Sequence, residues 1–441
     1  MEEAYVPDNN SLTIEDTLQP IVYTSWLLGV GVARPRKYPK IITIIIHSLY
    51  LVLCFVNIVY NVKDYHIFRE DFDIDTDIHK IMFFANLGII YVVTFYDVYH
   101  GIKLYDKWPE LMDRIKNLDQ KINEETLMND RSLKIMEALA ILTTFAWSLI
   151  TYISYYYFTN VQHIFVSNLL FFFIAARSLI NSFVFDIVVY VLYYRLRTIN
   201  QLIGQLNKSS EATLIALKIK WIRKLHNVIY DLVVMINDIH GLHLLLCAVN
   251  TFTVVITKLL IVYLSVKSVK KDYTVILVNN GIWILYTMQF GLMCWICTLA
   301  RQESNMIGIN INAFVLNCKP VNLDKVNRVK SQSYPDVSIE DPGSKKNFNR
   351  NGHNLNYVVV ENLLCKDIAQ DCIRNEISDF LIQLQQYQVT FTACDFFEMS
   401  NALFCGFIGV IATYLIIFIQ FHQQSEHRNI DNVIQMAPEH N

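Results

Sequence analysis

Seven long apolar runs constrain this chain more than any other feature. Each run has about 20 residues or more, and a helix of about 20 residues crosses a hydrocarbon core of roughly 30 Å. Because a bilayer offers no hydrogen-bond partner to exposed backbone, such runs fold as membrane-spanning helices. The sequence therefore predicts an all-α membrane protein with seven transmembrane helices. The runs cover approximately residues 41–60, 81–102, 135–158, 164–194, 242–266, 274–299 and 402–421.

The composition agrees with a membrane protein. Hydrophobic residues make up 53% of the 441 residues and charged residues 17%, whereas a soluble domain usually carries about 25% charged residues. The net charge of −3 and the lack of a basic tract give no sign of nucleic acid as a partner, and the expected environment is a lipid bilayer. Residues 1–16 are acidic and polar, so no cleavable signal peptide is expected.

Motifs typical of catalysis or cofactor binding do not occur in the sequence. There is no HExxH, GxSxG or glycine-rich phosphate loop, which argues against an enzyme and against a cofactor. Cys294 and Cys297 have a CxxC spacing, but they lie inside an apolar run without a second pair nearby. We therefore expect buried thiols there rather than a metal site.

Positive charge orients the predicted helices. Lys and Arg concentrate before the first run and in loops 103–134, 195–240 and 301–398, and are sparse in the loops on the other side. Since cytosolic loops are enriched in Lys and Arg, the N-terminus is expected in the cytosol and the C-terminus outside. This inverted topology is opposite to that of a G-protein-coupled receptor and argues against a metabotropic seven-helix receptor, the alternative function. A transporter is disfavoured because no inverted repeat is evident.

The chain divides into parts of different character. The apolar stretch 21–32 is too short to span a membrane and is expected at the interface or as a buried cytosolic piece. A segment late in the chain, residues 319–356, is rich in Asn, Lys, Ser and Asp, and this composition indicates disorder. The predicted parts are 1–40, a cytosolic segment; 41–300, six transmembrane helices with cytosolic extensions; 319–356, a disordered cytosolic insert; 366–398, an amphipathic cytosolic helix; and 402–421, the seventh transmembrane helix.

The cytosolic segments carry apolar faces that require partners. Ile373, Ile377 and Phe380 lie on one face of a helix just before the last run. Residues 195–240 also have a helical pattern, with Leu225 and Ile229 on one stripe. We therefore predict a cytosolic helical bundle, the anchor region, which is shared between subunits.

The last apolar run carries its small and polar residues on one face. Gly406, Gly409, Thr413 and Gln420 are separated by three, four and seven residues, and Ile417 lies in the gap of that stripe. One interpretation is close packing of helices through small residues. The other is a pore lining, with Gln420 near one mouth.

The end of the same run resembles a known family. Thr413-Tyr414, five apolar residues and Gln420-Phe421 are similar to the C-terminal signature of insect gustatory receptors. The stretch from Phe391 to Cys394, followed by Phe397, resembles the sequence that this family carries before its last helix. Asp395 departs from the family, in which many members have Gly. Leu415 stands where the main sugar-sensing clade tends to have an acidic residue, which points outside that clade to bitter-type or fructose-type relatives.

The resemblance implies a function. Gustatory receptors are seven-transmembrane ligand-gated channels related to insect olfactory receptors, in which an anchor region holds four subunits around a central pore. By this resemblance Gln420 and Phe421 are gate residues, with Ile417 and Thr413 along the pore. The expected protein is a non-selective cation channel in the plasma membrane of sensory neurons. It would form a homo-tetramer, or a hetero-tetramer with related subunits, and would open on binding a small-molecule tastant.

Charged residues lie within the predicted membrane spans, among them Asp97, Arg177, Asp186 and Lys258. Charges at this depth are costly and mark functional positions by default. Arg177 and Asp97 are expected to pair with each other, and such a pair either fixes helix packing or contacts a ligand. Lys258 can also extend toward the outer surface.

Aromatic and amide side chains gather in the outer halves of the third to sixth helices. Flat rings cover the apolar faces of a small organic molecule, while amides and hydroxyls bond its heteroatoms. The alternative is an aromatic belt at the membrane interface, which Tyr155 also fits. The predicted ligand-binding residues are Trp147, Thr151, Tyr155, Asn168, Asn280 and Trp283, together with Asp97 and Arg177.

Overall fold

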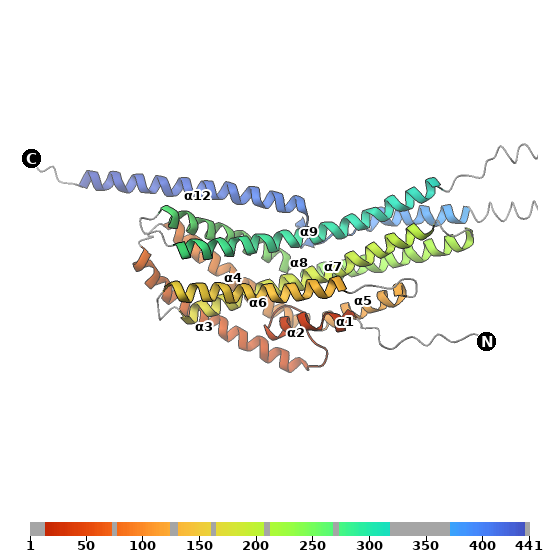
Figure 1. Ribbon diagram of the computed structural model, residues 1–441, viewed down its shortest axis with the longest axis horizontal. Coiled ribbons are helices and arrows are strands. Elements are labelled where there is room, and N and C mark those ends of the chain that lie inside the picture. The colour runs from red at the N-terminus through yellow and green to blue at the C-terminus, as the bar shows by residue number, and fades with distance from the viewer. Residues whose placement is uncertain are drawn as a thin grey trace, which may run out of the picture. The chain divides into compact units, whose positions relative to one another are not determined.

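The fold is mostly α-helical (Figure 1). The computed structural model describes residues 14–72, 77–123, 131–159, 165–206, 212–267, 273–317 and 371–436. The predicted disordered insert 319–356 lies outside these residues. The helices are α1 Ile14–Thr17, α2 Gln19–Leu27, α3 Lys40–Phe72, α4 Asp77–Lys103, α5 Lys107–Asn123, α6 Arg131–Thr159, α7 Phe165–Leu206, α8 Ala212–Lys267, α9 Tyr273–Asn317 and α12 Asn401–Met436.

The described helices contain the predicted apolar runs, apart from residue 164, which lies outside the described residues. Five of these helices are long and apolar enough in their described residues to cross a membrane. The chain is thus a helical protein with several candidate membrane spans, while α4 and α6 remain predictions as spans. The five candidate segments are Lys40–Val59, Ala176–Leu206, Thr213–Lys267, Val275–Val315 and Asn401–Gln424.

The chain forms two compact units, and α7, α8 and α9 contribute residues to both. The first unit comprises Met1–Tyr194, Asp231–Arg301 and Val389–Asn441, and the second comprises Arg195–Tyr230 and Gln302–Gln388. Within the first unit, a core of buried residues joins α4, α8, α9 and α12. Met82 lies on α4, Val255 on α8, Ile282 on α9 and Ile411 on α12.

The short apolar stretch near the N-terminus is buried in the first unit. It forms α2 and an irregular loop, residues 28–33, in which Val30 is 1% exposed. Gly31 has φ +66°, a conformation that an L side chain rarely adopts, and a Cβ there would lie 2.5 Å from Asn181 Oδ1. Glycine therefore allows the loop to approach α7 closely. The sequence allowed this stretch to lie at the membrane interface or to be buried, and the structure shows that it is buried.

The second unit contains a helix over residues 371–386, which is shorter than the predicted amphipathic helix 366–398. Residues 366–370 lie outside the described residues, and residues 392–398 form a β-hairpin instead of a helix. Phe380 is fully buried and its ring meets His226 edge-on, with the centroids 5.9 Å apart. Arg223 of α8 binds Asp379 at 2.8 Å and Glu376 at 3.2 Å. The apolar face predicted for this helix is therefore packed against α8, and its charged residues hold the edge of that contact.

A short hairpin lies between this helix and α12 in sequence. Strands β1 Thr392–Ala393 and β2 Phe397–Glu398 are antiparallel, with Thr392 opposite Glu398. Cys394 and Asp395 adopt left-handed φ values of 51° and 60°, which cost a non-glycine residue about 1–2 kcal/mol. The Asp395 side chain accepts a hydrogen bond from Thr392 Oγ1 at 2.9 Å. A short polar side chain tolerates this backbone through local hydrogen bonds, so Asp at position 395 is compatible with the hairpin.

Candidate functional site

One face of α12 packs against α8 and α9, and the helix runs beside both in Figure 1. The ring of Phe407 lies 4.6 Å from that of Phe290, and Tyr414 lies 5.7 Å from Phe252. Ile411, between these two aromatic residues on the same side of the helix, is buried. Aromatic and aliphatic residues three or four positions apart thus form the attachment of α12 to the first unit.

The small and polar stripe lies on the opposite face of α12. A Cβ added at Gly406 or Gly409 would meet no described atom within 4 Å. Thr413 is exposed and donates to Gly409 O of its own helix at 2.9 Å. Gln420 and Phe421 are exposed as well, and Ile417 is partly exposed. The stripe therefore makes no close helix packing with the described part of this chain.

The low burial of α12 distinguishes it from the other candidate spans. Only 6% of its apolar window is buried among the described residues, compared with 83% for the corresponding window of α7. Lipid accounts for a uniformly apolar surface, but it gives no hydrogen-bond partner to the exposed amide of Gln420. The stripe thus has the character of a surface for water or for another subunit.

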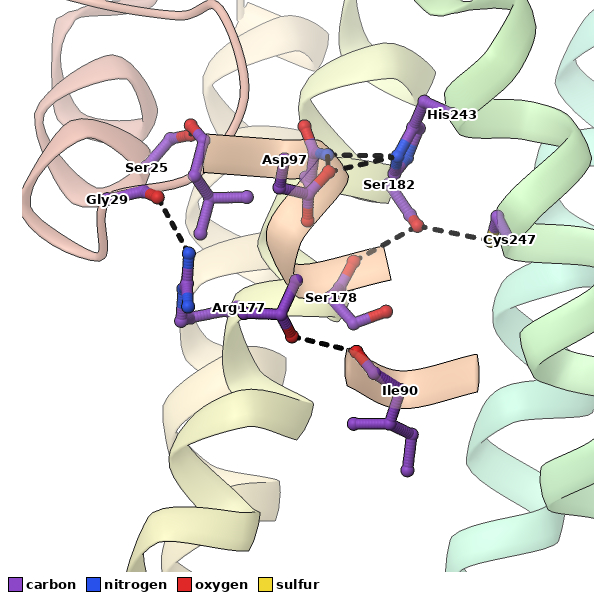
Figure 2. Close-up of polar contacts among 12 residues, drawn as sticks. Ser25, Gly29, Ile90, Asp97, Arg177, Ser178, Ser182, His243 and Cys247 are labelled. Atoms are coloured by element: carbon purple, nitrogen blue, oxygen red, sulfur yellow. Dashed lines mark hydrogen bonds and ion pairs between the residues drawn. The ribbon is translucent and has the colours of Figure 1, made fainter. Parts of the chain in front are cut away.

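Arg177, on α7, is buried and bonds to the N-terminal part of the chain. Its Nη2 donates to Gly29 O at 2.8 Å, as Figure 2 shows, and its Nη1 lies 3.7 Å from Cys54 Sγ. The guanidinium also lies over the ring of Tyr50, with 5.0 Å to the centroid. Arg177 thus ties α7 to the buried loop and to α3.

Asp97, on α4, has partners of its own. Asn181 Nδ2 donates to Asp97 Oδ1 at 3.0 Å and lies 3.0 Å from His243 Nδ1. His243 Nδ1 and Asp97 Oδ1 are 3.7 Å apart. The structure therefore does not pair Asp97 with Arg177 as expected. The Asp97 carboxylate accepts from the Asn181 amide, and the Arg177 guanidinium donates to the backbone carbonyl of Gly29.

Asp97 and Arg177 nevertheless line the same cavity, which we call the Arg177 cavity. Its volume is about 10 Å³, enough for roughly one water molecule. Residues of α4, α7, α8 and α9 contribute to its wall. The lining residues are Ile90, Val93, Thr94, Asp97, Ile174, Arg177, Ser178, Asn250 and Tyr286.

Asp186, the other buried acid of α7, is bonded separately. Gln289 Nε2 of α9 donates to Asp186 Oδ2 at 2.8 Å. The expectation that this acid needs a partner on another helix is met by an amide. Lys258 lies on α8, within the longest of the five candidate membrane segments.

The aromatic residues predicted to bind ligand form a different group. Trp147 of α6 packs on Gly281 of α9, where a Cβ would lie 2.7 Å from the indole. On the same turn of α9, Trp283 Nε1 donates to Asn280 Oδ1 at 2.9 Å. The structure thus brings together three predicted residues, none of which lines the Arg177 cavity. Thr151, Tyr155 and Asn168 lie on α6 and α7, but their side chains are outside the described part of the structure.

Several polar residues of the core were not predicted as site residues. Asn181 follows Arg177 by four positions, and Asn250 follows His243 by seven, so each pair shares one helix face. These uncharged polar groups interrupt apolar runs with helical periodicity. That periodicity is a signal which a search for charged residues alone does not use.

The described residues combine several helices long and apolar enough to cross a membrane with a buried polar core and an exposed polar stripe on the last helix, as expected of a multi-pass membrane protein. The family model described as 7tm Chemosensory receptor matches residues 18–325 and 362–425. The chain therefore belongs to this chemosensory receptor family, in agreement with the gustatory-receptor-like tail.

Solved structures show the same fold. The insect olfactory receptor OR5 from Machilis hrabei matches with a TM-score of 0.57 and 10% identity, covering 92% of this chain and 97% of that chain. The structure of OR5 in complex with eugenol matches with a TM-score of 0.58, also at 10% identity and with the same coverage. No curated protein matches the sequence.

Proposed function

We propose that this protein is a ligand-gated, non-selective cation channel of the gustatory receptor type. The observation that carries the proposal is the stripe of Gly406, Gly409, Thr413 and Gln420, which faces away from the helices on which α12 packs. A polar stripe on a membrane helix is stable next to water or protein but costly next to lipid. Membership of a chemosensory receptor family supports a role in ligand detection.

In this proposal, α12 of each of four subunits lines a central pore. Four Gln420 side chains supply amide dipoles to a passing cation, and four Phe421 rings close a dewetted gate. Thr413 and Ile417 line the pore next to this gate. The second unit, with the helix at 371–386 inside the proposed segment 366–398, forms the anchor region. The partners are identical subunits or related receptor subunits.

The proposed orientation follows from charge. The N-terminal segment 1–40 and the insert 319–356 lie in the cytosol, seven helices span the plasma membrane, and the C-terminus is outside. Residues 41–300 form the ligand-binding bundle and 402–421 the pore helix. We place the protein in sensory neurons by its resemblance to gustatory receptors.

The proposed ligand is a small-molecule tastant, a bitter compound or a fructose-type sugar. OR5 has been solved in complex with eugenol, a small organic molecule. By analogy, the group of Trp147, Asn280 and Trp283, together with Thr151, Tyr155 and Asn168, is the proposed outer binding site. Rings and amides at this position suit an organic molecule with several heteroatoms. Arg177 and Asp97 belong to a second proposed contact region.

Terminal epitope tags test the orientation on which the channel depends. Each terminus is tagged in turn, and intact cells are stained before and after permeabilisation. Labelling of the C-terminal tag alone in intact cells is the expected result. Labelling of the N-terminal tag alone would reject the inverted topology and favour a metabotropic receptor that signals through a cytosolic partner. Staining of both tags after permeabilisation is the control for expression.

A further inference from the structure

Two buried polar atoms at the Arg177 cavity have no hydrogen-bond partner among the described residues. They are Arg177 Nε and Asn250 Oδ1. Both residues line the cavity, and they are 3% and 2% exposed. Buried polar groups in folded proteins are nearly always paired, by protein or by a bound molecule. A group bound in this one small cavity and paired with both atoms would explain why two such atoms lie on its wall.

The chemistry of the two atoms selects that group. Arg177 Nε carries a hydrogen and can only donate, whereas Asn250 Oδ1 can only accept. A hydroxyl accepts from the first and donates to the second at the same time. A carbonyl or an ether can only accept, and an ammonium can only donate. We propose that the Arg177 cavity is a binding site for one hydroxyl group, supplied by water or by an alcohol.

The size and wall of the cavity agree with a single hydroxyl. A volume of about 10 Å³ holds one water-sized group. Ile90, Val93 and Ile174 form an apolar part of the wall, which can cover the carbon atoms of an alcohol. Thr94 donates its own hydrogen to Ile90 O at 2.8 Å, so its oxygen remains an acceptor. An alcohol larger than the cavity requires the wall to move, whereas water does not.

The site also connects two parts of the first unit. Arg177 holds Gly29 O of the buried N-terminal loop, and Asn250 lies two residues before Phe252, whose ring contacts Tyr414 of α12. A hydroxyl bonded to both residues links the loop to the helix against which α12 packs. Its presence therefore favours one relative position of α7 and α8. This inference deepens the proposed ligand detection. It rests on that proposal only where an alcohol supplies the hydroxyl, because a bound water does not depend on ligand detection.

A matched pair of small molecules tests the proposal without a known tastant. The full-length protein is purified in detergent, and its thermal unfolding is followed in 2-propanol and in acetone at equal concentration. The two probes have the same carbon skeleton, and 2-propanol carries a hydroxyl where acetone carries a carbonyl. The same series is run on Asn250→Leu, which removes the acceptor at similar size. A high-resolution electron cryomicroscopy map without alcohol shows whether water-sized density lies between Arg177 Nε and Asn250 Oδ1.

The outcomes separate the two sources of the hydroxyl. A higher midpoint in 2-propanol than in acetone, lost in Asn250→Leu, shows an alcohol site. Equal midpoints, with water-sized density bonded to both atoms, show a water site. The proposal is overturned if acetone stabilises the protein as much as 2-propanol and the map lacks that density. The wild-type comparison and the map remain decisive if Asn250→Leu does not fold. No readout uses ion current, so a failure here is distinct from a failure of the proposed channel.

Discussion

Asp97 on α4 and His243 on α8 approach each other to 3.7 Å, and Asn181 of α7 lies within 3.0 Å of both. The amide nitrogen of Asn181 can only donate, so Nδ1 of His243 accepts and the ring proton is placed on Nε2. Figure 2 shows Asp97 and His243 facing each other, with Ser182 and Cys247 close to them. Three helices are therefore held together by one amide in the core of the first unit.

Asn181→Leu should destabilise the protein. The substitution leaves the buried Asp97 and His243 without their shared donor, at a cost of about 2–4 kcal/mol for two buried groups. Thermal unfolding of the detergent-purified protein measures the loss. Asn401→Leu is the matched control, because Asn401 is exposed at the start of α12 and its substitution should change the midpoint little. Equal midpoints for the two variants would show that the network does not stabilise the fold.

The N-terminal loop can be tested by a pair of glycine substitutions. Gly31→Ala places a Cβ 2.5 Å from Asn181 Oδ1 on a backbone with φ +66°, so we expect a loss of about 2–4 kcal/mol. Gly88→Ala, on an exposed position of helix α4 with no described atom within 4 Å, should stabilise by up to about 1 kcal/mol. Thermal unfolding of both variants measures the difference. A Gly31→Ala protein as stable as the parent would mean that the loop is not packed against α7.

A pair of phenylalanines tests the packing of the second unit. Phe380 is fully buried beside His226, and Phe380→Ala should cost about 3–5 kcal/mol. Phe396, in the hairpin, is 77% exposed, so Phe396→Ala should leave the stability of the chain unchanged within about 0.5 kcal/mol. Limited proteolysis followed by unfolding measurements compares the two. Similar protection in both variants would contradict the packing of the helix at 371–386.

Gln420→Ala and Phe421→Ala should alter the resting current of cells that express the protein. Loss of the Phe ring widens the closed gate and raises the leak, whereas loss of the amide changes the preference among cations. Voltage clamp with replacement of external cations measures both effects without a ligand. Ile408 lies on another face of α12, so Ile408→Ala is the control. Unchanged leak and selectivity in both gate variants would remove Gln420 and Phe421 from the gate.

The sequence was sufficient to predict the helices because long apolar runs have few alternatives in a membrane. It also predicted an amphipathic helix around Phe380, and it gave burial as one of two alternatives for the residues near Val30. The partner of Arg177 was not predictable in this way. The sequence offered a carboxylate, Asp97, as the obvious counter-charge, but tertiary packing placed the carbonyl of Gly29 beside the guanidinium instead. A backbone carbonyl leaves no signal in composition or periodicity.

The sequence left two alternatives for the role of the α12 stripe, because small residues suit both close helix packing and a pore lining. The structure excludes close packing of the stripe against the described part of the same chain, because a Cβ added at Gly406 or Gly409 would meet no described atom within 4 Å. The Asn181–His243 contact was missed because uncharged polar residues in apolar runs are common. Their shared helix faces were the available clue.

The central claim is that the stripe of α12 faces water in the assembled protein, and cysteine accessibility tests it most directly. Single cysteines at Gly409, Thr413 and Ile411 are introduced after the exposed native thiols Cys372, Cys394 and Cys405 are replaced by Ser, and labelling is measured relative to this parent. Permeabilised membranes are treated with a charged, biotinylated methanethiosulfonate, which reacts with thiols in water and not in lipid. The account predicts labelling at positions 409 and 413 and none at 411. Labelling at 411 alone, or no labelling at 409 and 413, would contradict a water-filled pore lined by this helix.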